Sequence, residues 1–599
     1  MKIVNIFLVA LLLTSVSSVF SGDKKKSMKY TQYVPYVDKA SFTPKKVDLS
    51  GVKKVSSSPG VSVVGGLANT YYDFQTNGGD EHRVHVLPDG SVHVVYMGGT
   101  NRAAIGDASR GSFYAFSDDF GETFTNLGRV EFERAGFPSL GVTSEGYALI
   151  VSHTGAVLGT SLFVDALPGL GIFTSYDAPR APIECIWPRA AVSTNNRVIF
   201  YGSSGGTDVP GNTWNALDLG TSSFAFTENQ PLFPDVGNEI RGSIAASAGG
   251  KVALVLINGF NPPPVADFGN NNIIMRESTD GGLTFGDPVN VTGYPSDTTS
   301  VHEAFWLGIS AIYIGEELHI VWNEVIDQVP GDAGISYFGP DLRIKHWAAS
   351  VNGGVPTTAA RWDSVHFSIN QTEGVNHLPL DYPSIGVDEN GILTVVFTGF
   401  SGDTLNADPV SGYAYGDIWA VSSANNGLLW GEPTNLTNSV DMDDRYPYIS
   451  SWNESGKINV MYMSDSVAGS FAFTDGAPVS TPDFLFLKVD HPSTEPYDFY
   501  ATAVEDKTPA VPERFSLEQN YPNPFNPSTN IAFTLAKAEN AKLEIFNTIG
   551  QRVATLVNGK LPAGQHNITW DAKDMPSGIY FYKLEAGTFS QVKKMILAK

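Results

Sequence analysis

Three features are scarce in this sequence: cysteine, charged residues and long apolar runs. Cys185 is the only cysteine among 599 residues, so the chain can form no internal disulfide and no cysteine cluster for zinc or iron-sulfur. No segment after the N-terminus has the roughly 18 consecutive apolar residues that a transmembrane helix needs. Long helical patterns rich in Ala, Glu, Lys and Leu are also missing, which disfavours a helical fold.

The residues that are abundant favour strands and turns. The chain has 60 Gly, and 12% of its residues are aromatic, a mixture typical of many short strands joined by turns. Only 17% of the residues are charged, yet 38 basic and 62 acidic side chains leave a formal net charge of −24. Such a surface repels phosphate backbones, so we expect no nucleic-acid partner.

The N-terminus is typical of an exported protein. Lys2 is followed by an apolar stretch over residues 6–16 and by small residues before a cut after Ser21, which predicts a signal peptide over 1–21. The apolar stretch is too short for a comfortable membrane span, so we expect no transmembrane segment after its removal. Residues 22–60 show no sustained period and are predicted to be an extended leader.

One pattern recurs along the central region: an alternating strand, a Gly or Asn turn, and a second apolar strand. The copies are HRVHVLPDGSVHVVYM (82–97), FPSLGVTSEGYALIVS (137–152), WPRAAVSTNNRVIFYG (187–202), IRGSIAASAGGKVALVL (240–256), WLGISAIYIGEELHIVW (306–322), YPSIGVDENGILTVVF (382–397) and YPYISSWNESGKINVMYM (446–463). Seven such hairpins predict an all-β fold, a seven-bladed β-propeller over residues 61–490. Six or eight blades, or two stacked sandwiches, are the alternatives.

A second motif lies between these hairpins. SDDFGETF at 117–124 returns as STDGGLTF at 278–285, with weaker copies at 350–354 and 423–430. An Asp or Asn side chain can bond the backbone of its own turn, and Gly permits a positive φ. The shared positions are Ser117, Asp119, Gly121, Thr123, Phe124, Ser278, Asp280, Gly282, Thr284, Phe285, Asn425, Gly427 and Trp430.

These motifs resemble the Asp-boxes of sialidase-like propellers with BNR repeats. The resemblance implies structural hairpins between outer strands, away from the ligand face, and it implies no particular activity. We therefore expect the motif to build blades, with its final aromatic residue packed into the blade.

Ionisable and aromatic residues return just before each predicted inner strand. In a propeller these positions surround the mouth of the central channel, so we predict a ligand site there. Its candidate residues are Arg83, Arg189, Arg241, Glu303, Asp381, Tyr382, Arg445 and Tyr446. Such a mixture suits a carbohydrate, a peptide or an anionic small molecule. The alternative is that these charges cap strand ends and pair across blades.

No catalytic residue can be assigned. The resemblance to sialidases would imply a site with three arginines, a tyrosine nucleophile paired with a glutamate, and an aspartate acid/base. The Phe-Arg-Ile-Pro signature of that family is absent from this sequence. The nearest strings are GFPS at 136–139 and WPRA at 187–190. Asp441, Asp443 and Asp444 offer oxygen ligands that Ca²⁺ prefers, without an EF-hand spacing, and a solvated acidic loop is the alternative. We predict no metal or cofactor as a fixed part of the site.

The C-terminal region is predicted to be a separate small all-β domain. A linker over 491–514 is followed, at 515–599, by several alternating strands with Pro and Gly turns, which suits an Ig-like β-sandwich. The segment resembles the type A C-terminal sorting domain of type IX secretion cargo. The motifs that carry the resemblance are YPNPFNP (521–527), IFNTIG (545–550), Gly564 with Trp570, SGIY (577–580) and KMILAK (594–599).

This resemblance implies a bacterial protein that the type IX machinery recognises through residues 515–599 and that is secreted or held on the outer cell surface. For the propeller, our first hypothesis is a module that binds glycans or other extracellular polymers. A glycoside hydrolase, sialidase-like, or a polysaccharide lyase is the alternative, and a structural or adhesin scaffold is the second alternative.

Overall fold

The structure is a computed structural model of the chain. It describes residues 60–599 except 66–69, 77–81, 103–107, 156–158, 181–182, 195, 204–210, 233–240, 260–270, 294–300, 328–341, 363–366, 368–377, 401–406, 473–476, 498–514, 518, 521–522, 536, 538, 562–563, 574 and 588. For 301–307 and a few other strand residues it describes the backbone alone. The predicted signal peptide and nearly all of the predicted leader lie outside these residues. The chain divides into two compact units, before and after residue 498, which are described separately below.

The first unit contains seven antiparallel sheets of four principal strands each among its described residues. The innermost strands are β2 (Val84–Val86), β6 (Ala135–Val142), β10 (Ile186–Ser193), β15 (Gly242–Ala246), β19 (Val301–Ile314), β23 (Leu380–Asp388) and β27 (Asp443–Ile449). The second strands are β3 (Val92–Gly98), β7 (Ala148–Thr154), β11 (Arg197–Ser203), β16 (Val252–Gly259), β20 (Glu317–Asp327), β24 (Leu393–Phe400) and β29 (Lys457–Asp465). These two sets are the hairpins that the recurring sequence pattern predicts.

The outer half of each sheet is formed by a third and a fourth strand. The third strands are β4 (Gly111–Ser117), β8 (Gly159–Asp165), β12 (Asn212–Asp218), β17 (Asn271–Ser278), β21 (Leu342–Ala348), β25 (Gly416–Ser423) and β30 (Asp483–Asp490). The fourth strands are β5 (Thr125–Arg129), β9 (Phe173–Asp177), β13 (Ser223–Phe224), β18 (Val289–Asn290), β22 (Thr357–Arg361), β26 (Thr434–Asn435) and β1 (Val61–Gly65). Short strands β14 (Gln230–Pro231) and β28 (Trp452–Asn453) add to two sheets. A 3-10 helix, η4 (Val351–Gly354), precedes β22, and the described residues contain no α-helix.

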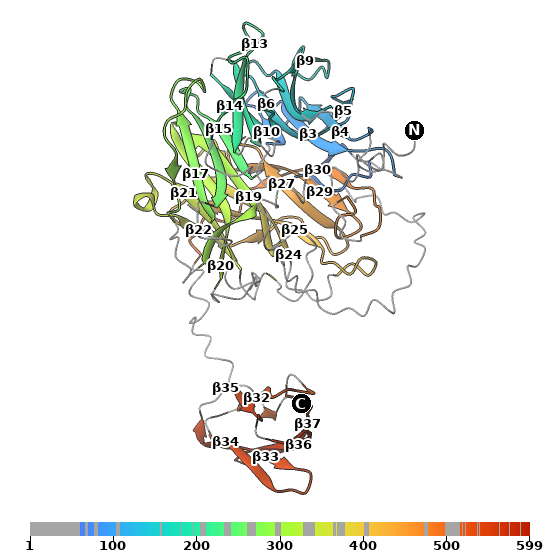
Figure 1. Cartoon of the computed structure of the whole chain (residues 1–599), viewed down its shortest axis with the longest axis vertical. Helices are drawn as coiled ribbons and strands as arrows, with labels where there is room; N and C mark the ends of the chain where they lie inside the picture. Colours follow the sequence, from blue (N-terminus) through green and yellow to red (C-terminus); the bar gives the residue numbers. More distant parts are fainter. Residues whose placement is uncertain are drawn as a thin grey trace. The chain divides into compact units, whose positions relative to one another are not determined.

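The sheets form a closed ring. Each innermost strand contacts that of the next sheet, and the first and seventh sheets meet through β2 and β29. Figure 1 shows the sheets following the sequence around a common centre, so that the orange strands β27, β29 and β30 lie beside the blue strands β3 and β4. The ring is closed by the N-terminal strand, because β1 pairs with β30 and so completes the last sheet.

Serine side chains tie neighbouring innermost strands together. A serine hydroxyl of one strand accepts the backbone N–H of the adjacent strand at five junctions, with distances of 2.9–3.3 Å. The serines are Ser139, Ser243, Ser310, Ser384 and Ser450, and their donors are Ala190, Ala311, Ile385, Ile449 and Val86. Each bond satisfies a buried backbone donor that lies at the edge of its own sheet.

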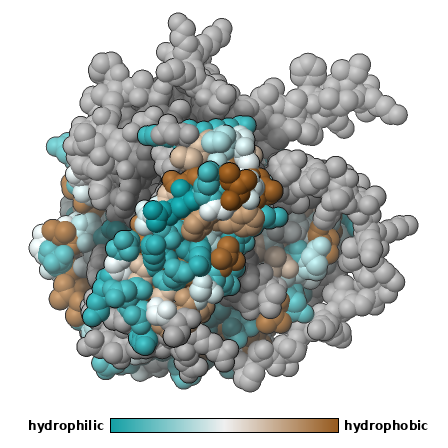
Figure 2. All heavy atoms as spheres, turned by 90° about the horizontal axis from the view of Figure 1, so that it is seen from below, coloured by the Kyte–Doolittle hydropathy of each residue, from teal (hydrophilic) through white to brown (hydrophobic). Residues whose placement is uncertain are grey.

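The core lies between the sheets. Strands such as β3 and β7 are buried along their whole length, because a propeller sheet has a neighbour on each face, and this explains their nearly continuous apolar sequences. Figure 2, a view of the whole chain from below, shows hydrophilic and hydrophobic residues mixed over the described part of that face.

The repeated Ser-x-Asp motif forms a tight turn between third and fourth strands. The Ser117 hydroxyl donates to Asp119 Oδ1 (2.6 Å), and the Asp119 carboxylate accepts the backbone N–H (2.9 Å) and the hydroxyl (2.7 Å) of Thr123. The backbone N–H of Gly121 donates to the Ser117 hydroxyl (2.9 Å). The turn at 278–285 has the same set of bonds, and the turn at 423–430 reproduces most of them with an amide in place of the carboxylate.

The aromatic residue at the end of each turn packs against the preceding sheet, and Phe285 also packs against a core cluster that contains Ile244 and Ile274 of its own sheet. Phe124 lies 5.2 Å from Phe486, Phe285 lies 4.9 Å from Trp214, and Trp430 lies 5.3 Å from His346, measured between ring centres. The turns are therefore contacts between neighbouring sheets as well as connections within one.

The second unit is a small β-sandwich. One sheet contains β31 (Ser516–Leu517), β32 (Ser528–Leu535) and β35 (Gly564–Asp571), and the other contains β34 (Arg552–Leu561), β33 (Glu539–Asn547), β36 (Gly578–Ala586) and β37 (Phe589–Leu597). Apolar residues from both sheets, among them Ile531, Ile545, Trp570 and Tyr582, form one core. The predicted all-β architecture, a propeller followed by a sandwich, is confirmed. The exact domain boundaries stay predictions.

A substitution at one turn glycine tests the contact between sheets. Gly282 has a φ of +81°, and an added Cβ would lie 2.3 Å from Ile199 of the preceding sheet. Gly282→Ala should lower the free energy of unfolding by about 2–5 kcal/mol, because the left-handed conformation and the overlap both cost energy.

Gly391→Ala is the matched control, since Gly391 has a φ of +79° and open space around its Cβ position. It should cost only about 1–2 kcal/mol. Denaturant unfolding followed by tryptophan fluorescence compares the two variants, and equal losses would show that the turn makes no critical contact with the neighbouring sheet.

Candidate functional site

The channel mouth is the end of the central channel at which the innermost strands begin. The pairing register shifts near the start of β6, β10, β23 and β27. One aromatic residue at each shift, and one just before β2, has a positive φ: His82 (44°), Phe137 (51°), Trp187 (49°), Tyr382 (49°) and Tyr446 (53°). Such a conformation costs roughly 1–3 kcal/mol for a bulky residue and persists only where the surroundings impose it. The fold therefore uses strain to gather aromatic rings around the mouth.

Two of the predicted arginines lie beneath these rings. Arg83 and Arg189 are 0% and 1% exposed. Arg83 Nη2 donates to the carbonyl of Gln75 (2.6 Å), and its guanidinium lies 5.6 Å from the centre of the Tyr448 ring. Arg189 Nη1 donates to the carbonyl of Trp187 (3.2 Å). Both side chains thus bind backbone groups of the mouth itself.

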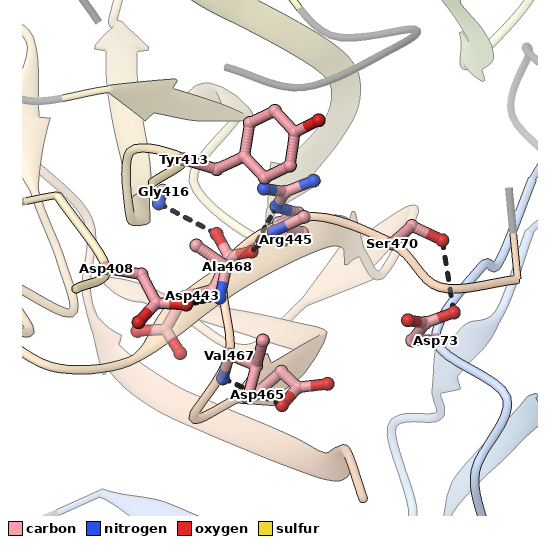
Figure 3. Close-up of polar contacts among 12 residues, drawn as sticks. Asp73, Asp408, Tyr413, Gly416, Asp443, Arg445, Asp465, Val467, Ala468 and Ser470 are labelled. Atoms are coloured by element: carbon pink, nitrogen blue, oxygen red, sulfur yellow. Dashed lines mark hydrogen bonds and ion pairs between the residues drawn. The ribbon is translucent and has the colours of Figure 1, made fainter. Parts of the chain in front are cut away.

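Arg445 forms a buried ion pair with Asp443. Arg445 Nε lies 2.6 Å from Asp443 Oδ2, and neither side chain is more than 1% exposed. The same carboxylate accepts the backbone N–H groups of Gly416 (2.9 Å) and Gly469 (3.1 Å), and Figure 3 shows Asp443 between Gly416 and Arg445. Burial raises the pKa of Asp443, and the Arg445 guanidinium opposes that rise. A carboxylate with these partners holds two loops together.

Further buried aspartates hold the loop that follows β29. Asp408 accepts the backbone N–H of Ala468 (3.2 Å), and Asp465 accepts the N–H of Val467 (3.0 Å) and the hydroxyl of Ser480 (Figure 3 shows the first two). Burial raises the pKa of Asp465 to about 8, although the bond from Ser480 lowers it. The protonated, neutral form of Asp465 is therefore part of this loop's framework near neutral pH.

Residues 70–76, which precede β2, fill the mouth. This segment has no regular secondary structure, yet every residue except Tyr71 is buried. Asp73 accepts the backbone N–H groups of Phe471 (2.6 Å) and Ala472 (2.9 Å) and the hydroxyl of Ser470 (3.0 Å); Figure 3 shows the last of these bonds. The segment is thus fastened to the loop of the seventh sheet.

The next two side chains enter the aromatic ring of the mouth. Phe74 lies edge-on to Phe137 (6.4 Å, 82°) and to Tyr446 (6.2 Å, 90°). The side-chain amide of Gln75 donates to the carbonyl of Met97 (3.1 Å) and accepts its N–H (2.9 Å). Both bonds copy the pattern of a strand pair, so Gln75 takes the place of a missing backbone neighbour at the end of β3.

Little space is left. A cavity of about 10 Å³ lies beside Thr76, room for about one water molecule. Its lining residues are Thr76, Gly308, Tyr382, Pro383, Ser384, Pro447 and Tyr448. The ring of His82 bonds the carbonyl of Ile244 in the fourth sheet (2.7 Å), so a side chain from the first sheet spans the channel.

The structure brings most of the predicted site residues to this mouth. Tyr382 and Tyr446 lie 4.9 Å apart between ring centres, and Arg83, Arg189 and Arg445 are buried beside them. Arg83 and Arg445 do not line an open cavity, so their surroundings differ from those we expected.

The remaining three predicted residues differ from one another. Asp381 accepts the backbone N–H groups of Tyr382 (2.9 Å) and Leu378 (3.3 Å). Arg241 is half-buried before β15, and Glu303 lies in β19, where only the backbone is described. A ligand-binding role for all eight residues stays a prediction.

The three aspartates considered as calcium ligands have different surroundings. Asp441 is exposed, whereas Asp443 and Asp444 are buried and bonded to Arg445 and Ser464. In the described part of the chain, no three His, Cys, Asp or Glu side chains are placed to hold a metal ion.

The Ser-x-Asp turns lie between third and fourth strands, away from the mouth. Burial acts to raise the pKa of Asp280, but bonds from Thr284 and Ser278 outweigh it and lower the pKa to about 2, so this acid stays ionised.

Sequence reasoning did not foresee residues 70–76 or the serines between strands. The stretch TYYDFQT is aromatic and stands beside the polar NGGDE, which is a signal for a buried segment that carries no periodicity. The serines do recur in the repeated pattern, at the third position of FPS and YPS and at the fourth position of IRGS, but a hydroxyl there has no evident partner until the ring is known.

The C-terminal unit defines the class of the protein. Residues 519–598 match the family model of a secretion system C-terminal sorting domain. The chain therefore carries a sorting domain, which supports export by a type IX secretion system to the cell surface or beyond. Within the described residues no helix is long and apolar enough to cross a membrane.

Solved structures that are similar to this chain match it at low sequence identity. They include PorZ, a bacterial surface component of the type-IX secretion system of Porphyromonas gingivalis, at 12% identity over 88% of this chain and 60% of that one (TM-score 0.36). Others are the GH93 α-L-arabinofuranosidase of Fusarium graminearum (10%, 59% and 93%, 0.36) and a PL25 ulvan lyase (11%, 83% and 97%, 0.32).

This chain thus spans about 60% of the length of PorZ. No curated protein matches the chain. Identities this low bear on the fold alone.

The raised pKa of Asp465 predicts how stability depends on pH. Because the folded pKa is about 8 against an ordinary value of 3.8, the folded state keeps a proton that the unfolded chain releases. This contribution to stability is complete below pH 3.8 and is lost as the pH rises through about 8. Asp465→Asn can keep both hydrogen bonds without titrating, so its melting temperature should fall less than that of the parent between about pH 5 and about pH 9. Parallel melting curves for the two proteins across this range would contradict the assignment.

Proposed function

We propose that this protein is type IX cargo whose propeller binds glycans or another extracellular polymer and does not cleave it. The observation that carries the proposal is the state of the mouth carboxylates. Asp381 and Asp443 are 0% exposed and are bonded to backbone N–H groups or to Arg445. An acid or base in glycoside cleavage must instead reach the substrate.

The mouth tyrosines support the same conclusion. Burial, with Tyr446 and Asp381 nearby, holds the pKa of Tyr382 well above its usual range. A phenol in that state is a poor nucleophile at neutral pH, since the phenolate is the reactive form. A sialidase-like use of Tyr382 is therefore disfavoured, although the Ser-x-Asp turns have the hydrogen bonds expected of Asp-boxes.

Exposed apolar side chains in the connections near the mouth offer a binding surface. Phe132 is fully exposed just before β6, and Val440 is 78% exposed before β27. Phe471, whose own backbone N–H donates to Asp73, has a side chain that is 40% exposed. Aromatic faces present large apolar area with little loss of side-chain freedom, so they suit the flat faces of sugar rings or of other polymer units.

Glycoside hydrolase or polysaccharide lyase activity is the second candidate, and it rests on Glu303 and Arg241. Glu303 lies near the start of the innermost strand β19, and Arg241 precedes the innermost strand β15 and is only half-buried. A structural or adhesin scaffold without a small-ligand site is the third. These candidates differ in what a purified protein does to a polymer, which makes them separable in one assay.

Export tests the role of the sorting domain. In a bacterium with a type IX system, a chain that ends at residue 514 should stay within the cell envelope, because the segment that the machinery recognises is missing. Immunoblots of culture medium, surface-exposed protein and envelope measure the distribution. Lys537→Ala, which changes a side chain 70% exposed in the sorting domain, is the control and should be exported normally. Export of the truncated chain would contradict this part of the proposal.

Binding and turnover test the role of the propeller. Residues 22–599 are screened against sialylated, uronic-acid and neutral glycans by calorimetry and by product analysis. We expect binding without products, and Phe132→Ala should weaken it about fivefold, since one aromatic contact contributes roughly 1 kcal/mol. Glu303→Gln should leave binding unchanged and Arg241→Ala should weaken it. Product formation that Glu303→Gln abolishes would instead establish a glycosidase or lyase.

A further inference from the structure

Residues 72–76 are held at the mouth in the way that a protein holds a bound peptide. The segment lacks strand pairing, and its successive side chains contact different sheets. Asp73 is bound by the loop after β29 in the seventh sheet, Phe74 by the second and seventh sheets, and Gln75 by the end of β3. Thr76 reaches residues of the fifth, sixth and seventh sheets around the small cavity. Short connections in propellers need no such contacts.

The polar groups of the segment are matched in type. The Asp73 carboxylate accepts hydrogen bonds from two backbone N–H groups and a hydroxyl. Burial raises the pKa of Asp73, and these three bonds oppose the rise. The backbone carbonyl of Gln75 receives the guanidinium of Arg83 at 2.6 Å. The Gln75 carboxamide forms hydrogen bonds with both the N–H and the carbonyl of Met97. Each recognition element is a donor or acceptor pair that a peptide supplies and that a neutral sugar does not supply in the same form.

Phe74 packs against aromatic residues whose backbone conformation is strained. Phe74 is edge-on to Phe137 and Tyr446, and both of these residues have a positive φ. Aromatic residues with a positive φ occur at the mouth in several sheets. Backbone strain of this kind is common at ligand sites. The indole N–H of Trp187, in the same ring of residues and 8% exposed, has no hydrogen-bond partner in the described part of the chain.

We propose that the channel mouth is a peptide-binding site whose present occupant is the chain's own segment 72–76. Its ligand in trans is an extended polypeptide that carries an acidic residue followed by an aromatic residue and a carboxamide, the order Asp-Phe-Gln. This inference rests on the proposed binding function and narrows the extracellular polymer to a polypeptide. A tethered segment acts at a high effective concentration, so the site of the unmodified protein is closed to weak free ligands.

The test uses the segment itself as probe. In residues 22–599, Asp73→Ser, Phe74→Gly and Gln75→Ser are combined to empty the site, and the blocked peptide Tyr-Tyr-Asp-Phe-Gln-Thr is titrated by calorimetry. The variant should bind the peptide at least about tenfold more tightly than the parent, because the internal competitor is gone. The same peptide with Ala in place of Phe should not bind. Leu428→Ala, which changes a 45% exposed side chain in the Ser-x-Asp turn away from the mouth, should behave as the parent.

A folded triple variant that binds no peptide would overturn the proposal. So would a triple variant that binds glycans of the panel and not the peptide, since the mouth would then be a carbohydrate site. If the triple variant does not fold, Phe74→Ala supplies the same comparison. A third measurement needs no destabilising change: in fluorine NMR of 4-fluorophenylalanine at position 74, peptide above the roughly millimolar effective concentration of the tethered segment should shift the signal, and an unchanged signal would overturn the proposal.

Failure of this inference and failure of the proposed function can be told apart. Absence of glycan binding by the parent protein bears on the proposed function and leaves the peptide titration of the variant readable. Glycan binding by the parent together with no peptide binding by the folded variant would retain the proposed function and exclude the peptide site.

Discussion

The ring depends on the hydrogen bond between a serine hydroxyl of one innermost strand and a backbone amide of the next. Apart from the two residues of β23 that pair with β28, the described innermost strands have no partner strand on the channel side, so their outward donors need another acceptor. Ser139 and Ser384 supply one immediately after a proline that has no N–H of its own. The bulge, the proline and the serine thus form one local unit, which turns an aromatic ring toward the mouth while it ties two sheets together.

The junction between the first and last sheets needs more than this bond, because no covalent link closes the ring. Strand β1 completes the seventh sheet, and Ser450 bonds Val86. Asp73 adds three bonds to the loop after β29. The buried pair of Arg445 and Asp443 holds that same loop through Gly469. A buried ion pair contributes little net stability but is costly to break, so its effect here is to fix one arrangement of the loops.

Local patterns predicted much of the fold. The inner hairpins follow from period-two sequences with a Gly or Asn turn, and the Ser-x-Asp turns follow from side chains that bond their own backbone. Contacts distant in sequence were not predictable. The sequence does not show that strand β1, at residues 61–65, completes the last sheet by pairing with β30. Arg83 precedes an inner strand, as the sequence indicates, but a sequence does not show that a neighbouring segment such as 70–76 binds and helps to bury it.

Burial of the mouth and the strain around it lead to the same conclusion about function. Catalytic carboxylates require access to substrate and a tuned pKa, whereas Asp443 has neither a free edge nor a path to solvent in this structure. Strained aromatic residues that served only to seal a channel could be replaced by relaxed apolar ones at no loss. Their position around Phe74 is explained if the mouth must recognise a chain segment specifically, and a segment that is recognised without regular pairing can be exchanged for another of the same chemistry.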